Sequence, residues 1–143
     1  MPDTRMTKSE REDFLAAPHI GVVSIPRAGE APLSAPVWYD YKKGGDIWFL
    51  TGPTSAKGKL LSLQTPVTMV AQNEAMPYAY VSVECLVEDM RQATDEETLQ
   101  MAIRYLGEEM GAAYAKANAG SVSIKLTLGT KRWLTVDYAK TSL

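Results

Sequence analysis

Seven short segments with the composition of β-strands, separated by turn residues, constrain the fold of this chain more than any other feature. β-branched, aromatic and aliphatic residues dominate them, and polar and apolar residues alternate in the longest. Because short turns join several neighbours, we expect antiparallel pairing, and about seven short strands favour a closed or nearly closed barrel over an open sheet. The segments are Ile20–Ile25, Leu33–Tyr41, Ile47–Thr51, Val67–Gln72, Tyr78–Met90, Ser121–Leu128 and Arg132–Tyr138.

Several positions inside and between these segments predict local irregularities. Pro36 has no N–H to donate to a sheet, which indicates an edge position, a bulge or a place where something other than a strand approaches the backbone. The order of polar and apolar residues shifts after Glu84, so we expect a bulge near Leu86. Turns are predicted at Pro26–Gly29, at Lys42–Asp46 and, between the last two strands, at Gly129–Lys131.

Four helices are predicted around the strands. Thr7 and Glu10 stand in the spacing of a capping box and open a helix over Thr7–Ala17. Thr94 and Glu97 repeat that spacing before Leu99, Ala102, Ile103 and Leu106, which recur on one face of a helix. A short helix over Ala56–Leu63 and another over Glu108–Asn118 complete the set.

Composition limits the classes of function. The 143 residues suffice for one domain with a core, and 45% hydrophobic with 22% charged residues is the balance of a globular protein. A net charge of −2 argues against a protein that coats nucleic acid or an anionic membrane. The polar first residues and the lack of a roughly 20-residue apolar run favour a cytoplasmic protein over an exported or membrane-spanning one.

Single copies of cysteine and histidine exclude several kinds of site. Cys85 has no partner for an intrachain disulfide, and its place on the apolar side of a strand indicates a core residue. With His19 as the one histidine, expected on a surface turn, a zinc site of the usual type cannot be assembled, and no metal site is predicted. No GxSxG motif supplies the serine of a hydrolase triad either. Nothing in the sequence selects another catalytic residue, so none is assigned.

The stretch Ile47–Leu63, IWFLTGPTSAKGKLLSL, predicts a strand, a tight loop and a helix, with a candidate anion-binding site at the start of the helix. Hydroxyl and lysine side chains gather where the helix begins, and a helix start favours anions, phosphate above all. The segment is not a Walker A loop, because five residues separate its glycines and Leu60 replaces the required Ser or Thr. The alternative is that the lysines form the solvated face of a small helix. The side chains concerned are Thr51, Thr54, Ser55, Lys57 and Lys59.

The order of strand, Thr51, loop, Ser55-x-Lys57, helix and TPVT resembles the split-barrel flavin-binding superfamily, the pyridoxamine 5'-phosphate oxidase-like proteins. Within it, the chain is similar to the flavin/deazaflavin-dependent oxidoreductases. The similarity runs from IGVVSI through APLSAPVWYDY and DIWFLTGPTSAKGKLLSLQTPVTMV to YAYVSVECLVEDM, RYLGEEMGAAY and KRWLTVDYAK. It implies a mostly β fold with peripheral helices, an antiparallel split β-barrel (FMN-binding split barrel) formed by residues 1–143 as a single cofactor-binding domain.

The resemblance also implies where a cofactor would bind. The matching loop and helix hold the cofactor phosphate, which assigns that role to Thr51, Ser55, Lys57 and Lys59. The ring lies along the matching strands, at Ser34, Ala35, Pro36, Val37, Trp38 and Leu50. Members of the family are usually homodimers with the cofactor at the subunit interface, so Tyr78, Tyr80 or Trp133 would reach the site from the partner chain.

The chain departs from the family pattern at the phosphate site. Ala56 stands where an arginine often precedes the family lysine, and Lys59–Leu60 replaces an arginine–asparagine pair. Losing a bidentate arginine weakens geometric recognition of a phosphate while lysine keeps the charge. The second phosphate-binding site of the pyridoxamine oxidases is not evident in KRWLTVDYAKTSL.

The sequence therefore predicts a redox protein that binds the deazaflavin coenzyme F420, with FMN as the alternative, and transfers a hydride between the cofactor and a small conjugated acceptor. The cofactor would carry the chemistry and the protein would bind and orient it. Another alternative is a non-enzymatic protein that binds the cofactor or a tetrapyrrole, and haem degradation is a further one.

Overall fold

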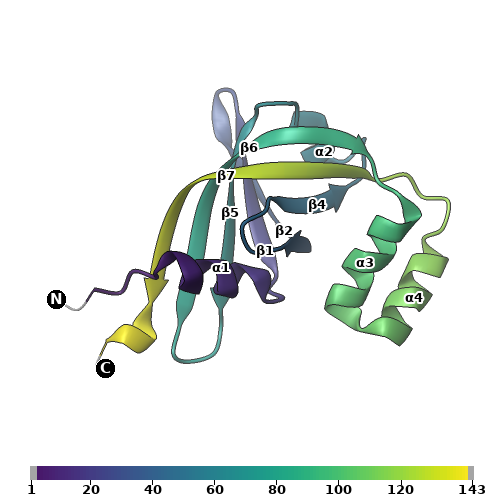
Figure 1. Cartoon of the computed structure of the whole chain (residues 1–143). Helices are drawn as coiled ribbons and strands as arrows, with labels where there is room; N and C mark the ends of the chain where they lie inside the picture. The colour runs from purple at the N-terminus through teal and green to yellow at the C-terminus, as the bar shows by residue number, and fades with distance from the viewer. Residues whose placement is uncertain (1–2, 142–143) are drawn as a thin grey trace.

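Seven strands form one antiparallel sheet in the order β2-β1-β5-β6-β7-β4-β3 in the computed structural model, which describes residues 3–141 (Figure 1). Every strand pair is antiparallel, as the short turns predict. The fold is thus mostly β with peripheral helices, as expected. The strands are β1 (Gly21–Arg27), β2 (Glu30–Val37), β3 (Tyr39–Tyr41), β4 (Ile47–Thr51), β5 (Pro66–Asn73), β6 (Ala79–Gln92) and β7 (Ile124–Asp137).

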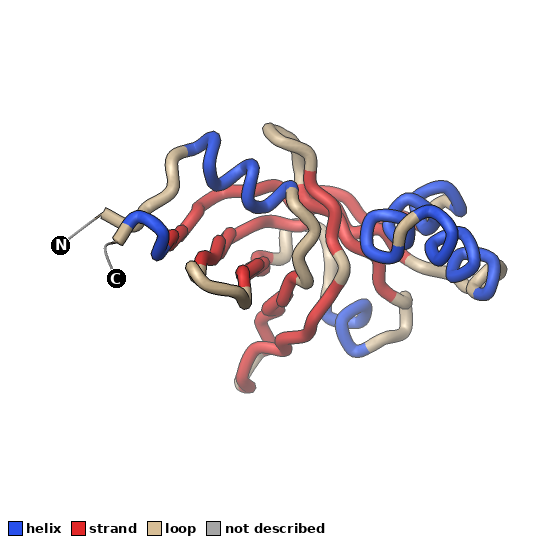
Figure 2. The backbone as a smooth tube through the Cα atoms, turned by 90° about the horizontal axis from the view of Figure 1, so that it is seen from below, coloured by secondary structure: helices blue, strands red, loops and turns tan. Residues whose placement is uncertain are grey.

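The two edge strands of this sheet follow one another in the chain. β2 and β3 lie at opposite ends of the strand order, yet only Trp38 separates them. The sheet must therefore curl until its edges approach, and Figure 2 shows the curl from below. Among the described residues no ladder joins β2 to β3, so the barrel stays split. We call the place where the chain passes from one edge to the other, at Trp38, the corner.

The final strand corrects the sequence prediction of two strands around a turn at Gly129–Lys131. β7 runs unbroken from Ile124 to Asp137 and pairs with β6 along its length. The register passes from Glu84↔Arg132 to Cys85↔Thr130, which leaves Lys131 as an extra residue, a bulge instead of a turn. Gly129 itself is buried, and a side chain there would collide with the Glu88 carboxylate.

A second register shift, between Val87 and Asp89, leaves Glu88 as an extra residue on β6. The two irregularities bracket Leu86, near which the sequence predicts a bulge. The predicted strand Leu33–Tyr41 is in turn divided at Trp38, and its two parts pair with different neighbours, β1 and β4. A strand that bends and changes partners in this way makes the corner of a barrel.

α1 lies on the side of the sheet where the chain ends are, α3 and α4 lie together on the other side, and α2 lies near β4 (Figure 1). Capping boxes open α1 (Lys8–Ala16) at Thr7 and α3 (Asp95–Leu106) at Thr94, as predicted. α4 (Glu108–Ala117) forms a hairpin with α3 beyond the end of the sheet opposite α1. α2 (Ala56–Leu60) ends three residues before its predicted end, because the backbone of Leu61 is extended and its side chain is buried. A 3₁₀ turn, η1 (Tyr138–Lys140), follows β7.

The hydrophobic core fills the inner face of the curled sheet. Leu15 of α1 contributes to it, and its largest fully buried side chains include Tyr39 and Phe49. Cys85 is buried among them, which confirms its predicted core position, and burial raises the pKa of its thiol to about 12. His19 is half-buried and stacks on Phe14, with ring centroids 4.4 Å apart, so it is less exposed than a surface turn implies.

None of the described helices is long and apolar enough to cross a membrane.

Candidate functional site

A pocket of about 640 Å³ opens beside the corner. Strands form one wall, through Pro36–Trp38 and Leu50–Gly52, and Lys57 of α2 adds to it. The facing wall comes from the α3–α4 hairpin and the segment that follows it. The volume falls within the roughly 300–1,000 Å³ of small-molecule sites. The second wall is lined by Asp95, Thr98, Leu99, Met101, Ala102, Ala112, Tyr114, Ala115, Lys116, Asn118, Ala119, Ser121 and Ser123.

Six of the predicted cofactor residues meet in this pocket. They come from three places in the sequence that the fold brings together: the end of β2 with the corner, the end of β4 and the first turn of α2. Thr51 is buried, Lys57 is half-buried and Pro36 is exposed. The six residues are Pro36, Val37, Trp38, Leu50, Thr51 and Lys57.

The Trp38 ring at the corner is held by two tyrosines of the helical hairpin. Tyr105 of α3 stacks on it nearly parallel, with centroids 5.1 Å apart and 8° between the planes. Tyr114 of α4 approaches at 5.5 Å and 51°. The Tyr105 hydroxyl accepts a hydrogen bond from Tyr39 N (3.0 Å) and lies 2.7 Å from its acceptor, the His19 carbonyl oxygen. The hairpin thereby fixes the aromatic side of the pocket.

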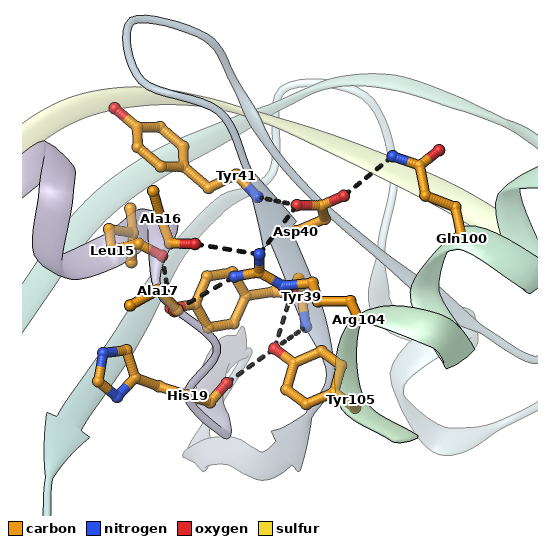
Figure 3. A network of polar contacts seen from close by, with 10 residues as sticks. All are labelled: Leu15, Ala16, Ala17, His19, Tyr39, Asp40, Tyr41, Gln100, Arg104 and Tyr105. Carbon is orange, nitrogen blue, oxygen red and sulfur yellow. Dashed lines mark hydrogen bonds and ion pairs between the residues drawn. The ribbon is translucent and has the colours of Figure 1, made fainter. Parts of the chain in front are cut away.

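A buried polar network ties α3 to the corner (Figure 3). The Arg104 guanidinium donates to the carbonyl oxygens of Tyr39 (2.8 Å), Ala16 (3.0 Å) and Ala17 (3.2 Å). It also pairs with the Asp40 carboxylate at 3.3 Å, and that carboxylate accepts a hydrogen bond from Gln100 Nε2 at 3.2 Å. Burial raises the pKa of the Tyr39 and Tyr105 hydroxyls, so both stay protonated donors at neutral pH.

The other end of α3 is anchored by a second set of charges. Both Glu97 oxygens accept hydrogen bonds from Arg91, at 2.8 and 2.7 Å, and Lys125 Nζ lies 2.7 Å from Glu97 Oε2. These donors, Arg91 first, hold the pKa of Glu97 well below its usual 4.5. Lys125 Nζ also lies 4.7 Å from the centre of the Trp48 ring on β4. Both ends of α3 are therefore fixed to the sheet.

Two of the three hydroxyls predicted to bind an anion, those of Thr51 and Ser55, are already engaged with each other. Ser55 Oγ donates to the Gly52 carbonyl oxygen (2.8 Å) and accepts from Gly58 N (3.0 Å), capping α2. Because Ser55 Oγ donates its only proton to Gly52, Thr51 Oγ1 must be the donor in the 2.9 Å hydrogen bond between the two hydroxyls. A side chain at Gly58 would collide with the Gly52 carbonyl oxygen, so the turn is compact. Lys57 is the cation that this turn presents to the pocket.

The remaining predicted residues lie outside the pocket lining. Ser34 is exposed on the outer face of the sheet, where its hydroxyl lies 2.8 Å from that of Ser24. Tyr80 lies on the same outer face, because it is two residues from Ser82 on β6 and side chains alternate between the faces of a strand. Trp133 packs inward, under the Arg11 guanidinium at 4.7 Å and edge-on to Tyr41. The pocket lining also omits Ala35, Ser55 and Lys59.

The α3–α4 wall is the part of the site that sequence reasoning missed. The capping box and the helical period predict the two helices, but neither pattern says which surface they cover. The one signal was compositional: Tyr105 and Tyr114 in RYLGEEMGAAY stand nine residues apart on the two helices. Aromatic residues on both arms of a helical hairpin are available to enclose a third ring.

Comparisons with known proteins support the fold. A scan against known protein families finds no match, and no curated protein matches the sequence. Among solved structures, a conserved hypothetical protein of Mycobacterium tuberculosis superposes with a TM-score of 0.76 at 18% identity, covering 99% of this chain and 91% of its own. An F420 reductase superposes at 0.66 and 20% identity, with 86% and 94% covered.

A third structure, the FAD and heme binding protein of Mycobacterium smegmatis, superposes with a TM-score of 0.63 at 14% identity, covering 94% of this chain and 72% of its own. At these identities the likeness concerns the fold alone. The split-barrel architecture predicted from the resemblance to the flavin-binding superfamily is confirmed at that level.

Proposed function

We propose that this protein binds a flavin-type cofactor, the deazaflavin F420 or alternatively FMN, in the pocket at the corner, and transfers a hydride between it and a small conjugated acceptor. One observation carries the proposal: six residues predicted from sequence to bind such a cofactor line a single pocket of fitting volume. The shared fold supports it, since structures of the same architecture include an F420 reductase and an FAD and heme binding protein.

The residues of the pocket suit a flat ring that carries an anionic tail. Trp38 offers aromatic surface and Leu50 offers apolar surface. Lys57 has no carboxylate within ion-pair distance among residues 3–141, so its charge is available to a phosphate. Lys57 would hold the phosphate, because the hydroxyl protons of Thr51 and Ser55 are already donated within the turn.

The protein's part in the reaction would be binding, orientation and exclusion of water. When bound, the cofactor supplies a hydride, with its two electrons, to a conjugated acceptor that completes its reduction by taking up one proton. Pro36–Trp38 and Leu50 would position the ring, and the α3–α4 wall would shield it. The lining holds no pair of carboxylates or carboxylate–histidine pair among the described residues, which agrees with chemistry carried by a cofactor.

We also propose that the protein works as a homodimer with the cofactor near the subunit interface. A row of directly paired residues crosses five strands on the outer face, and Leu134 at its end is 60% exposed. The row begins at Pro36, which also lines the pocket, so a second copy seated on this face would reach the pocket. Tyr80 on the same face would then be available to the partner's site. The row is Pro36–Val22–Val70–Ser82–Leu134.

The experiment that tests the proposed function is a titration of the purified protein with FMN and with F420, side by side, at low ionic strength. Lys57→Ala should weaken binding of the preferred cofactor by about 1.5–3 kcal/mol, the contribution of a charge-assisted hydrogen bond. Lys59→Ala is the matched control, since Lys59 is exposed on the same short helix and does not line the pocket. The control should bind as the wild type does.

The outcomes separate the candidate functions. Binding of neither cofactor, or equal effects of the two lysine variants, contradicts the proposed site. Tight binding without reduction of any conjugated acceptor indicates a carrier protein instead of an enzyme. A Soret band on titration with haem indicates a tetrapyrrole-binding protein. The predicted cytoplasmic location is tested separately by fractionation of cells that produce the protein.

A further inference from the structure

In the cofactor assignment, the half of the pocket formed by α4 only shields the ring. The strand wall and Lys57 account for a ring and its phosphate, whereas Tyr114, Lys116 and a set of alanines face them from α4 and its neighbours. The pocket thus offers a second place for a ligand beside the first. The alanines are Ala102, Ala112, Ala115 and Ala119.

Small and aromatic side chains on this wall suit a planar molecule. Alanine side chains leave room and offer a flat apolar surface, and the Tyr114 ring lies at 51° to Trp38. At a centroid separation of 5.5 Å these two rings already contact each other, so a planar ligand would lie against the pocket side of Tyr114, which is 43% exposed. The close approach of α4 to α3 depends on Gly111, since a Cβ there would lie 2.7 Å from Ile103 N.

The wall also carries its own positive charge. The charged residues that line the pocket are Lys57, Asp95 and Lys116, and the two lysines come from opposite walls. Among residues 3–141, neither Lys116 nor Asp95 takes part in an ion pair. The pocket therefore has a net charge of +1 in a chain whose net charge is −2, which favours anionic ligands over cationic ones.

α4 is attached to the rest of the molecule less directly than α3. α3 is fixed at one end by Glu97 and at the other by Arg104, whereas α4 packs against α3. Gly107 and Gly120, with φ of 85° and 89°, flank α4 in backbone conformations that suit glycine. Substitutions on α4 would therefore change which ligand the pocket binds with less effect on the sheet than substitutions on the other wall.

We propose that α4 is the element that selects the acceptor, and that it takes a planar conjugated acid, with the ring against Tyr114 and the carboxylate facing Lys116. The proposal rests on the proposed function for the assignment of the opposite wall to the cofactor. It adds a substrate class, an aromatic or conjugated carboxylate, and two residues that would bind it: Tyr114, which contacts the ring, and Lys116, which distinguishes the acid from neutral analogues.

The test is calorimetric titration with a matched pair of probes, naphthalene-2-carboxylate and its uncharged amide. The wild type should bind the carboxylate about three- to fivefold more tightly than the amide, the upper end of what an exposed ion pair contributes. Lys116→Gln should bring this ratio close to one and leave the amide affinity unchanged. Lys8→Gln, at an exposed lysine of α1, is the matched control and should keep the ratio.

Two further variants make the test specific. Tyr114→Ala should weaken both probes alike, because it removes ring contact and no charge, and equal binding by this variant and the wild type overturns the placement of the ring. Lys57→Gln should keep the probe ratio while it weakens FMN or F420 binding. A ratio that survives Lys116→Gln, a ratio lost only in Lys57→Gln, or no binding of either probe overturns the proposal.

The same variants separate failure of this proposal from failure of the proposed function. If FMN or F420 binds through Lys57 but the probe ratio ignores Lys116, the cofactor assignment stands and the acceptor assignment falls. If neither cofactor binds but the ratio depends on Lys116, the pocket is an acid-binding site and the proposed function falls.

Discussion

Replacement of Arg104 by methionine removes the guanidinium that ties α3 to the corner and keeps most of the apolar stem. The lost contacts are three hydrogen bonds to the carbonyl oxygens of Tyr39, Ala16 and Ala17 and the ion pair with Asp40. The pair is largely buried, since its side chains are 14% and 10% exposed. Methionine therefore leaves the Asp40 carboxylate buried without its cation.

The expected loss follows from what remains around Asp40. Removal of one partner from a buried ion pair costs about 3–5 kcal/mol, because the other charge is left uncompensated. Tyr41 N (2.8 Å) and Gln100 Nε2 (3.2 Å) continue to donate to Asp40, which places the expected loss at the low end, about 3 kcal/mol. A domain with about 5–15 kcal/mol of stability tolerates this and still folds.

Urea unfolding at pH 7, followed by tryptophan fluorescence, measures the free energy of unfolding. The double variant Arg104→Met, Asp40→Asn should regain about half of the loss, because it removes the orphaned charge. Arg104→Lys should fall between the wild type and the methionine variant, since it keeps the charge and loses the planar fork. A loss below about 1 kcal/mol for Arg104→Met, or a double variant no more stable than the single one, would mean that the Arg104–Asp40 pair does not stabilise the fold as a buried ion pair.

Three further predictions concern the hairpin, its acidic anchor and the outer face. Gly111→Ala should lower the stability to urea by about 2 kcal/mol, because its Cβ meets the Ile103 backbone, whereas helix propensity alone predicts a gain. The stability difference between the wild type and Glu97→Gln should be full above pH 4.5 and shrink in more acidic buffer, since the folded pKa is lowered; a difference independent of pH contradicts the anchor. Leu134→Glu should convert a dimer to a monomer in light scattering with little change in stability, and an unchanged mass contradicts the proposed interface.

Local patterns in the sequence predicted the parts of the fold whose cause is local. The capping boxes at Thr7 and Thr94 each satisfy backbone donors within a few residues, and both helices begin where expected. The core position of Cys85 follows from strand alternation alone. The split-barrel fold was predicted by resemblance, and the curl that it requires follows from the adjacency of β2 and β3 in the chain.

The errors fall where a distant segment decides the local structure. Gly129, Thr130 and Lys131 have the composition of a turn, but pairing with β6 keeps the chain extended and absorbs the extra residue as a bulge. The bulge is therefore not encoded within a short window of sequence. The contacts of Thr51 and Ser55 are local by contrast: each hydroxyl has one proton and the turn uses both, which residue type alone does not predict.

The corner at Trp38 explains why the pocket lies where it does. A barrel strand that changes partners leaves a gap between its two neighbours, and here β2 pairs with β1 while β3 pairs with β4. Trp38 lies between the two strands, so its side chain does not pack fully against either neighbour. It is half-buried and is covered by residues from outside the sheet. The Tyr105 ring of α3 stacks on Trp38 and covers it. The ion pair between Arg104, the residue before Tyr105, and Asp40 of β3 holds α3 in place. The binding pocket and the stability of the corner thus depend on the same contacts, so loss of Arg104 should impair ligand binding as well as folding.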